Sequence, residues 1–133
     1  MNAKYGYIYN GNYTNQRKIG ITKIGMTQCA PAARRGSIER QTGHKFRMRK
    51  YIRIENITKE DLLFVESWVR RSMAQVEGLT YDRESNDHFT FAIEQSRKYH
   101  QFEELADLTM KFAMEALEFM GYDLAKTKIK ECR

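Results

Sequence analysis

The sequence predicts an α/β (α+β) fold in one domain, with short strands in the first half of the chain and long helices in the second. In the first half, stretches rich in aromatic and β-branched residues are bounded by Asn and Gly, which is typical of strands and turns. In the second half, apolar residues recur at spacings of three and four, which indicates amphipathic helices. A chain of 133 residues is long enough for one compact core.

Three strands are expected in the first half. Residues 5–9 (YGYIY) favour a strand, and the Asn- and Gly-rich residues 10–16 favour a turn. Residues 17–27 favour a second strand that forms a hairpin with the first. The third strand is expected at 46–55 (FRMRKYIRIE), because apolar and basic residues alternate there. We expect one face to carry Phe46, Met48, Ile52 and Ile54 and the other to carry Arg47, Arg49 and Arg53.

Two helices are expected around the third strand. Pro31 suits the first turn of a helix, where its missing N–H is not needed. That helix is expected to end near Gln41, with Gly43 after it. Residues 58–76 favour a second helix, which Thr58 is placed to cap.

A long helix is expected near the end of the chain. Residues 88–93 favour a short strand or the lead into that helix, which should run from about Glu94 to Met120. Its apolar stripe consists of Phe102, Leu105, Leu108, Phe112, Ala116 and Phe119. Further apolar residues widen this stripe, so the helix either wraps the core with its whole width or forms the contact of a possible homodimer.

The charge is unevenly distributed along the chain. The net charge is +6, but residues 1–55 hold twelve Lys and Arg against two Asp and Glu. Residues 56–133 hold eleven Lys and Arg against fifteen Asp and Glu. A basic half joined to an acidic half favours a polyanionic partner such as DNA on one side of the molecule.

The composition also bears on location. No apolar run approaches the roughly 18 residues that suggest a membrane-spanning helix. The two cysteines, Cys29 and Cys132, lie far apart and fit a reducing compartment. We therefore expect a cytoplasmic protein with no membrane partner.

Residues 18–27 spell almost the same five residues twice, KIGIT and then KIGMT. Side chains in a strand alternate between faces, so an offset of five places Lys18 and Lys23 on opposite faces. Glycine weakens a strand interior unless something must pass close to the backbone, which draws attention to Gly20 and Gly25. One copy is therefore expected to have a role that the other lacks.

The ordered motifs GYIY, KIGMT, ARRGSIERQTG, FVESWV and NDHFTF resemble the GIY-YIG nucleases, in the branch with KIG in place of YIG. The resemblance covers about residues 5–91, with a helical extension at 92–133. It implies a central three-stranded antiparallel sheet flanked by helices. The second KIG is the better match to the family. Arg34 and Arg35 follow Lys23 by eleven and twelve residues, which is close to the spacing between strand and helix in the family.

The resemblance also implies a catalytic site for hydrolysis of DNA phosphodiester bonds. Its implied members are Tyr9 with its neighbour Tyr7, Lys23 in place of the second tyrosine, Arg35 or Arg34, Glu66, and Asn86 with Asp87 as the other candidate. Either Tyr9 or Lys23 is the implied general base. Glu66 is the implied ligand of one Mg²⁺ (or Mn²⁺). A carboxylate suits such a hard cation, because hard cations prefer oxygen ligands.

Structural roles compete with these assignments. Tyr7 is more simply an aromatic residue of a half-buried strand. Glu66 lies near the apolar face of its helix, where a carboxylate is costly unless it binds a metal or pairs with an arginine. The arginines at 47, 49 and 53 are expected either to follow a nucleic-acid backbone or to pair with the acidic helices.

The expected function is therefore that of a metal-dependent endonuclease acting on DNA. One alternative is a nucleic-acid-binding protein on the GIY-YIG fold that does not cleave. The other is an interaction protein that acts through its long helix. The enzyme is favoured over both alternatives, because the chain carries the whole implied catalytic set. This set is Tyr9, Lys23, Arg34 or Arg35, and Glu66.

Overall fold

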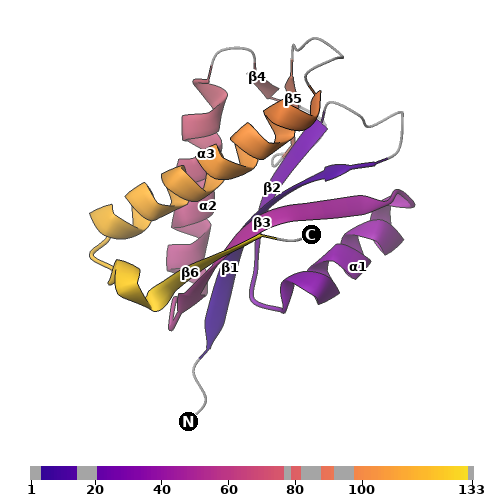
Figure 1. Cartoon of the computed structure of the whole chain (residues 1–133). Helices are drawn as coiled ribbons and strands as arrows, with labels where there is room; N and C mark the ends of the chain where they lie inside the picture. Colours follow the sequence, from indigo (N-terminus) through magenta and orange to yellow (C-terminus); the bar gives the residue numbers. More distant parts are fainter. Residues whose placement is uncertain (1–3, 15–20, 77–78, 82–87, 92–97, 132–133) are drawn as a thin grey trace.

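The computed structural model describes residues 4–14, 21–76, 79–81, 88–91 and 98–131. Its centre is an antiparallel sheet in the order β4-β5-β2-β1-β3-β6 (Figure 1). The three inner strands are β1 (Tyr5–Tyr13), β2 (Ile21–Thr27) and β3 (Phe46–Glu55). They are the expected three-stranded sheet, with β1 in the middle.

The sheet is wider than expected, because further strands extend both of its edges. On one side β4 (Leu79–Tyr81) and β5 (His88–Phe91) continue it beyond β2. On the other side β6 (Thr127–Glu131) pairs with β3. The sequence favoured a strand near 88–93 but indicated neither β4, which is only three residues long, nor β6, whose lysine-rich TKIKE reads as a tail.

Strand β1 runs through most of the stretch where a turn was expected. It continues to Tyr13 because its asparagines find partners inside the fold. The side-chain amide of Asn10 donates to Thr22 Oγ1 (3.1 Å) and to Thr109 Oγ1 (2.9 Å). Asn12 accepts a hydrogen bond from Arg49 Nε (2.6 Å). Buried polar groups are tolerated when they are hydrogen-bonded, so the turn propensity of asparagine is overridden here.

The two faces of the sheet carry separate cores. One core joins strand residues such as Ile8, Ile24 and Ile52 to helices α2 (Lys59–Ala74) and α3 (Lys98–Phe119). The other lies under α1 (Pro31–Thr42) and consists of Tyr9, Tyr13, Ile38, Phe46 and Met48, with Tyr51 packed against it. Odd-numbered residues of β1 therefore face α1, and even-numbered residues face α2 and α3.

The expected division of β3 into an apolar and a basic face is wrong. The pairing of β1 with β3 shifts by one residue between Asn10 and Gly11, because β3 carries an extra residue there. Beyond this bulge the faces exchange: Phe46 and Met48 join the core under α1, whereas Ile52 joins the core of α2 and α3. A bulge leaves no mark in the period-two pattern from which the faces were assigned.

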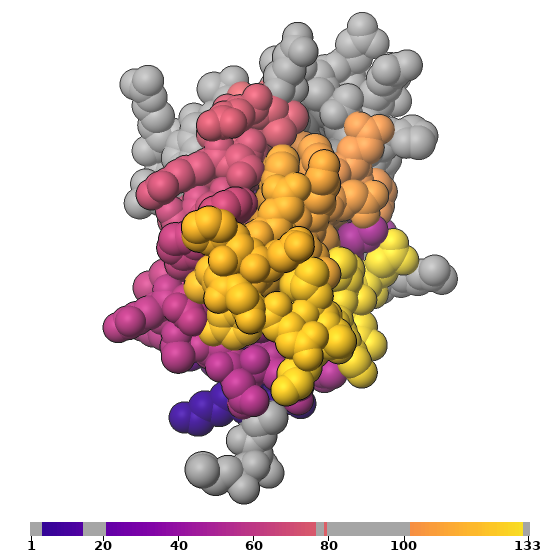
Figure 2. All heavy atoms as spheres, turned by 90° about the vertical axis from the view of Figure 1, so that its left-hand side faces the viewer, coloured from indigo at the N-terminus to yellow at the C-terminus, as the bar shows by residue number. Residues whose placement is uncertain are grey.

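The helices follow their sequence signals closely. Helix α1 begins at Pro31 and ends before Gly43, which adopts the left-handed conformation with φ 71°. Helix α2 is capped by Thr58, whose side chain accepts a hydrogen bond from the Asp61 backbone N–H (3.1 Å). Helix α3 is confirmed as the long C-terminal helix. Figure 2 shows that α2, α3 and the chain after α3 together cover one side of the molecule.

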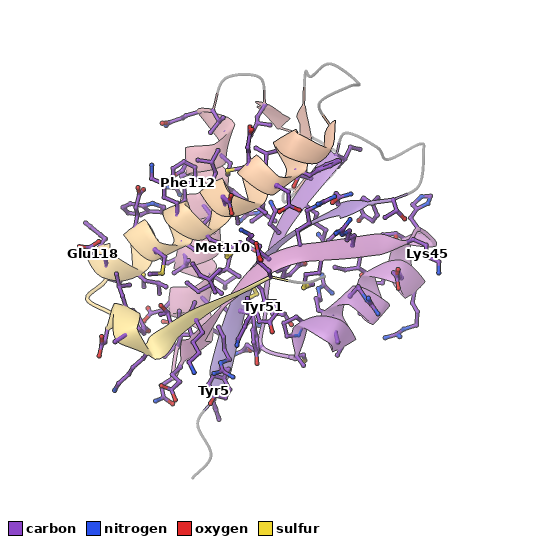
Figure 3. The ribbon with its side chains drawn as sticks, viewed as in Figure 1. Tyr5, Lys45, Tyr51, Met110, Phe112 and Glu118 are labelled. Atoms are coloured by element: carbon purple, nitrogen blue, oxygen red, sulfur yellow. The ribbon has the colours of Figure 1, made fainter. Side chains whose placement is uncertain are left out.

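The apolar stripe of α3 is mostly used within the domain. Phe102, Leu105 and Ala116 are buried, and Leu108 and Phe112 pack against the same core. Figure 3 labels Met110 near the middle of the helix and Glu118 near its end, of which Met110 is buried and Glu118 is exposed. Phe119 is the exception in the stripe, with 72% of its surface exposed. The helix therefore wraps the core, which is one of its two expected roles.

The segment after α3 returns to the sheet and fixes the helix at its end. A 3-10 turn, η3 (Leu124–Lys126), leads directly into β6. The Lys50 side chain on β3 contacts both Asp107 of α3 and Glu131 of β6, and the hydrogen bond to Asp107 raises the pKa of Lys50. Among the described residues, no helix is both long and apolar enough to cross a membrane.

Tyr122 also ties the chain after α3 to α2, and its ionisation gives a test of this contact. Its hydroxyl donates to Asp61 Oδ2 (2.6 Å). Burial and this hydrogen bond raise the pKa of Tyr122 to about 12. The unfolded chain, with an ordinary tyrosine pKa of about 10, releases the proton first, so the folding free energy should weaken as pH rises from about 10 to about 12.

Tyr122→Phe removes this ionisation. We expect the variant to lose stability less steeply than the native chain across that alkaline window, although it is less stable at neutral pH by about 1 kcal/mol. Urea denaturation of both proteins at several pH values measures the two slopes. Parallel pH profiles would contradict the contact between Tyr122 and Asp61.

Candidate functional site

Tyr9 is the centre of the candidate site. It is fully buried on the face of β1 that lies under α1. Its cross-strand neighbour on β2 is Gly25, and a β-carbon built on Gly25 would collide with the ring and hydroxyl of Tyr9. The tyrosine ring therefore crosses the backbone of β2 at the one position where no side chain stands in the way. This explains why the second KIG copy needs its glycine.

Arg34 of α1 reaches the end of that ring. Its Nε donates a hydrogen bond to the Tyr9 hydroxyl over 3.4 Å. The contact joins the first motif to the helical arginine and distinguishes the two arginine candidates. Arg35, one position further along α1, is exposed and lines a surface pocket instead.

Lys23 lies on the same face of β2 as Gly25, two residues earlier. Only 6% of its surface is exposed, and it stands opposite Gly11 of β1. A lysine so deeply buried is unusual, because its charge must be satisfied inside the protein. Lys18, the equivalent residue of the first copy, lies outside the described residues, so its predicted opposite orientation stays a prediction.

The edge of β2 beside this group is uncovered by any described strand. β5 pairs with residues 21–23 of β2, and within the described ranges residues 24–27 pair only with β1. The Tyr9 ring points across β2 toward this edge. Side chains on opposite faces of a sheet can approach one another around its edge, whereas elsewhere the strands lie between them.

Glu66 comes from the other face of the sheet. It lies on α2, between the core residues Leu62 and Val69, and only 9% of its surface is exposed. Arg70, one turn further along the helix, approaches its carboxylate to 3.4 Å. This is the arginine pairing that the sequence offered as the alternative to a metal ligand. Tyr9, Lys23 and Arg34 thus lie on the α1 side of the sheet, whereas Glu66 lies on α2, on the opposite side.

The remaining predicted site residues are dispersed. Tyr7 packs edge-on against Tyr51, with ring centroids 5.8 Å apart, as an ordinary strand aromatic would. Asn86 and Asp87 lie outside the described residues.

The three arginines of β3 do not form a stripe. Arg49 is buried, and its guanidinium binds Glu103 of α3 (2.5 Å) as well as Asn12. Arg53 lies over the ring of Tyr5, 4.7 Å from its centroid. Arg47 is exposed and shares the surface pocket with Arg35. The β3 bulge separates them. Arg49 pairs with the acidic α3, which is the alternative that the sequence offered. Phosphate contacts of Arg47 and Arg53 stay a prediction.

The surface pocket has a volume of about 440 Å³ and was not indicated by the sequence. It is lined by Ala30, Pro31, Ala32, Arg35, Arg47, Met48 and Tyr51. Figure 3 shows Tyr51 at the middle of the sheet, near the beginning of α1. Tyr51 stands opposite Tyr9 across the β1–β3 ladder, so the pocket lies next to the candidate site. Nothing in the period-two pattern of β3 distinguishes Tyr51 from its neighbours.

The described residues contain no group of three or more His, Cys, Asp and Glu side chains that could hold a metal ion. Comparison with protein-family models, with curated proteins and with solved structures found no match. The resemblance to GIY-YIG nucleases therefore depends on the motifs and on the contacts between them.

Gly25 gives a test of the Tyr9 geometry. Gly25→Ala should destabilise the fold by about 1–3 kcal/mol, because the new methyl group overlaps the tyrosine ring. Gly36→Ala is the matched control, since the nearest atom to its new β-carbon is the flexible end of Arg40, at 3.3 Å. Alanine inside α1 should stabilise the protein by about 0.5–1 kcal/mol. Both are measured by chemical denaturation.

The same experiment in a Tyr9→Leu background isolates the contact. There Gly25→Ala should be much less destabilising, because the ring that it overlaps is gone. Equal effects of Gly25→Ala in both backgrounds would show that the ring does not cross this glycine.

Proposed function

We propose that this protein is a metal-dependent endonuclease that hydrolyses DNA phosphodiester bonds at the edge of β2 that no described strand covers. The observation that supports it best is the contact of Arg34 with the Tyr9 hydroxyl across Gly25. Three motifs that resemble the GIY-YIG set, read separately in the sequence, meet in this contact. Lys23, on the same strand and face as Gly25, is a second residue of the KIGMT motif beside this contact.

The proposed roles follow from what the reaction needs. A water must lose a proton, and negative charge that develops on the phosphate must be stabilised. Either Lys23 or Tyr9 is the proposed base. Arg34 orients the tyrosine hydroxyl and adds positive charge beside it. Burial of Tyr9 and Lys23 strengthens these electrostatic interactions relative to water.

The donor set around Glu66 fits Mg²⁺ rather than a softer metal. Mg²⁺ in phosphate-processing proteins is commonly held by one or two carboxylates, the substrate phosphate and several waters. One nearly buried carboxylate meets that need, and Arg70 balances its charge when no metal is present. When bound, the ion would supply positive charge to the phosphate oxygens.

The decisive experiment is incubation of the purified protein with supercoiled plasmid in the presence of Mg²⁺, Mn²⁺ or EDTA. We expect nicked or linear products with either metal and none with EDTA. Unchanged plasmid with both metals, from a protein that retards the DNA on a gel, would favour the second candidate.

That second candidate is a nucleic-acid-binding protein that does not cleave. It is favoured by one observation, the complete burial of Tyr9, since a general base must reach the water that it activates. The binding candidate predicts salt-dependent affinity with no metal requirement, because phosphate contacts release counterions.

Glu66→Ala should reduce nicking to background and abolish the binding of Mn²⁺ while leaving the fold intact. Glu60→Ala is the matched control, because it removes an exposed carboxylate from the first turn of the same helix. Plasmid nicking and a metal titration followed by calorimetry measure both effects. Equal nicking by the two variants would show that Glu66 takes no part in cleavage.

Lys23→Met should lower the cleavage rate by about 100-fold or more, the usual contribution of a positioned proton-transfer group. Methionine keeps the apolar stem that is buried in the fold, so the loss reports the terminal amino group. Lys18→Met is the control from the first KIG copy and should cleave at the native rate. Similar losses in both variants would show that the second copy has no special role.

A further inference from the structure

The pocket beside α1 combines an apolar floor with two basic side chains. Met48 and Tyr51 of β3 line it from the sheet, and residues 30–32 line it from the beginning of α1. Arg35 and Arg47 contribute from the helix and from the strand. Apolar walls with a few polar groups are the usual composition of a small-ligand site.

Arg35 has no acidic partner among the described residues, unlike Arg49 and Lys50 of β3. Arg49 binds Glu103, and Lys50 contacts Asp107 and Glu131. Arg35 and Arg47 form no such ion pair within the described part of the chain, and both are exposed. The exposed guanidinium of Arg35 beside the pocket favours an anionic occupant, and phosphate suits its fork geometry.

The volume of the pocket and its aromatic lining restrict the class of ligand further. Ligand pockets range from about 300 to about 1,000 Å³, so a volume of about 440 Å³ suits one nucleotide and excludes a duplex. Tyr51 offers a ring on which a base can stack. A base inside a duplex cannot enter such a pocket, because it must first leave the stack.

We propose that this pocket binds one unpaired nucleotide of the DNA substrate, with its base against Tyr51 and its phosphate beside Arg35. The inference depends on the proposed function in assuming a nucleic-acid substrate. It adds a substrate class, DNA with an unpaired nucleotide close to the cleavage position. The position is suitable, because Tyr51 is the cross-strand neighbour of Tyr9 and Arg35 follows Arg34.

The test measures binding without cleavage, so its outcome is separate from that of the nuclease proposal. A labelled single-stranded oligonucleotide and a duplex of equal length are titrated with the protein in EDTA and followed by fluorescence anisotropy. We expect tighter binding of the single strand. Tyr51→Leu should weaken single-strand binding by about tenfold, and Tyr51→Phe should bind as the native protein does, because the phenyl ring still stacks.

Charge is tested with a matched pair of arginines on α1. Arg35→Ala should weaken binding and reduce the salt dependence of affinity by about one phosphate contact, a slope change of about 0.7 for single strands. Arg40→Ala removes an equally exposed charge from the last turn of the same helix and should bind as the native protein does. Equal losses for the two variants, or native affinity in both Tyr51→Leu and Arg35→Ala, would overturn the pocket assignment.

Cys29 supplies a local reporter, because it is exposed and immediately precedes the pocket residues at 30–32. In a Cys132→Ser background, the oligonucleotide should slow alkylation of Cys29 in the native pocket but not in Tyr51→Leu. Unprotected Cys29 at saturating oligonucleotide would place the DNA elsewhere. Protein that binds in this way but leaves plasmid intact would refute the nuclease proposal alone.

Discussion

Strand β1 is paired along both edges and packed on both faces, and the rest of the fold is placed by it. Its even-numbered residues pack into the core shared with α2 and α3, and its odd-numbered residues pack into the core under α1. Because it lies between β2 and β3, any change in its register moves the contacts of both neighbours. The hydrogen bonds of Asn10 to Thr22 and Thr109 hold this register, since they join β1 to β2 and to α3 at once.

The uneven charge of the sequence has a structural explanation in the contacts between β3 and its neighbours. Glu103 and Asp107 of the acidic second half face Arg49 and Lys50 of the basic first half. These pairs compensate the charges that fall on the α3 side of the sheet. Arg35 and Arg47, which form no ion pair within the described residues, line the pocket near α1.

Local signals were sufficient for the positions of the main elements. Pro31 and Gly43 bound α1, and Thr58 caps α2, because proline, glycine and threonine have strong positional preferences. The bounds of β3 were also predictable from its alternation. Its bulge was not, because a bulge is determined by the partner strand and not by the pattern of one strand.

The same distinction applies to the candidate site. The family resemblance indicated an arginine of α1 as a partner in the site but left Arg35 and Arg34 open, and in the structure it is Arg34 that contacts Tyr9. The role of Tyr51 could not be anticipated, since it depends on which strand faces the first turn of α1. Strand β6 was missed for a related reason, as a lysine-rich edge strand has little apolar signal and depends on β3 for its pairing.

The return of β6 to the sheet has a consequence for how fast the chain can fold. The ladder between β6 and β3 joins residues such as Ile129 and Ile52, between which lie all of α2 and all of α3. Thr109 and Asn10 are similarly distant in the chain. The entropy of closing such long loops is lost before the contacts form, so folding should be slow for a domain of this size. Until that closure is complete, the outer edge of β3 stays open to pairing with another chain.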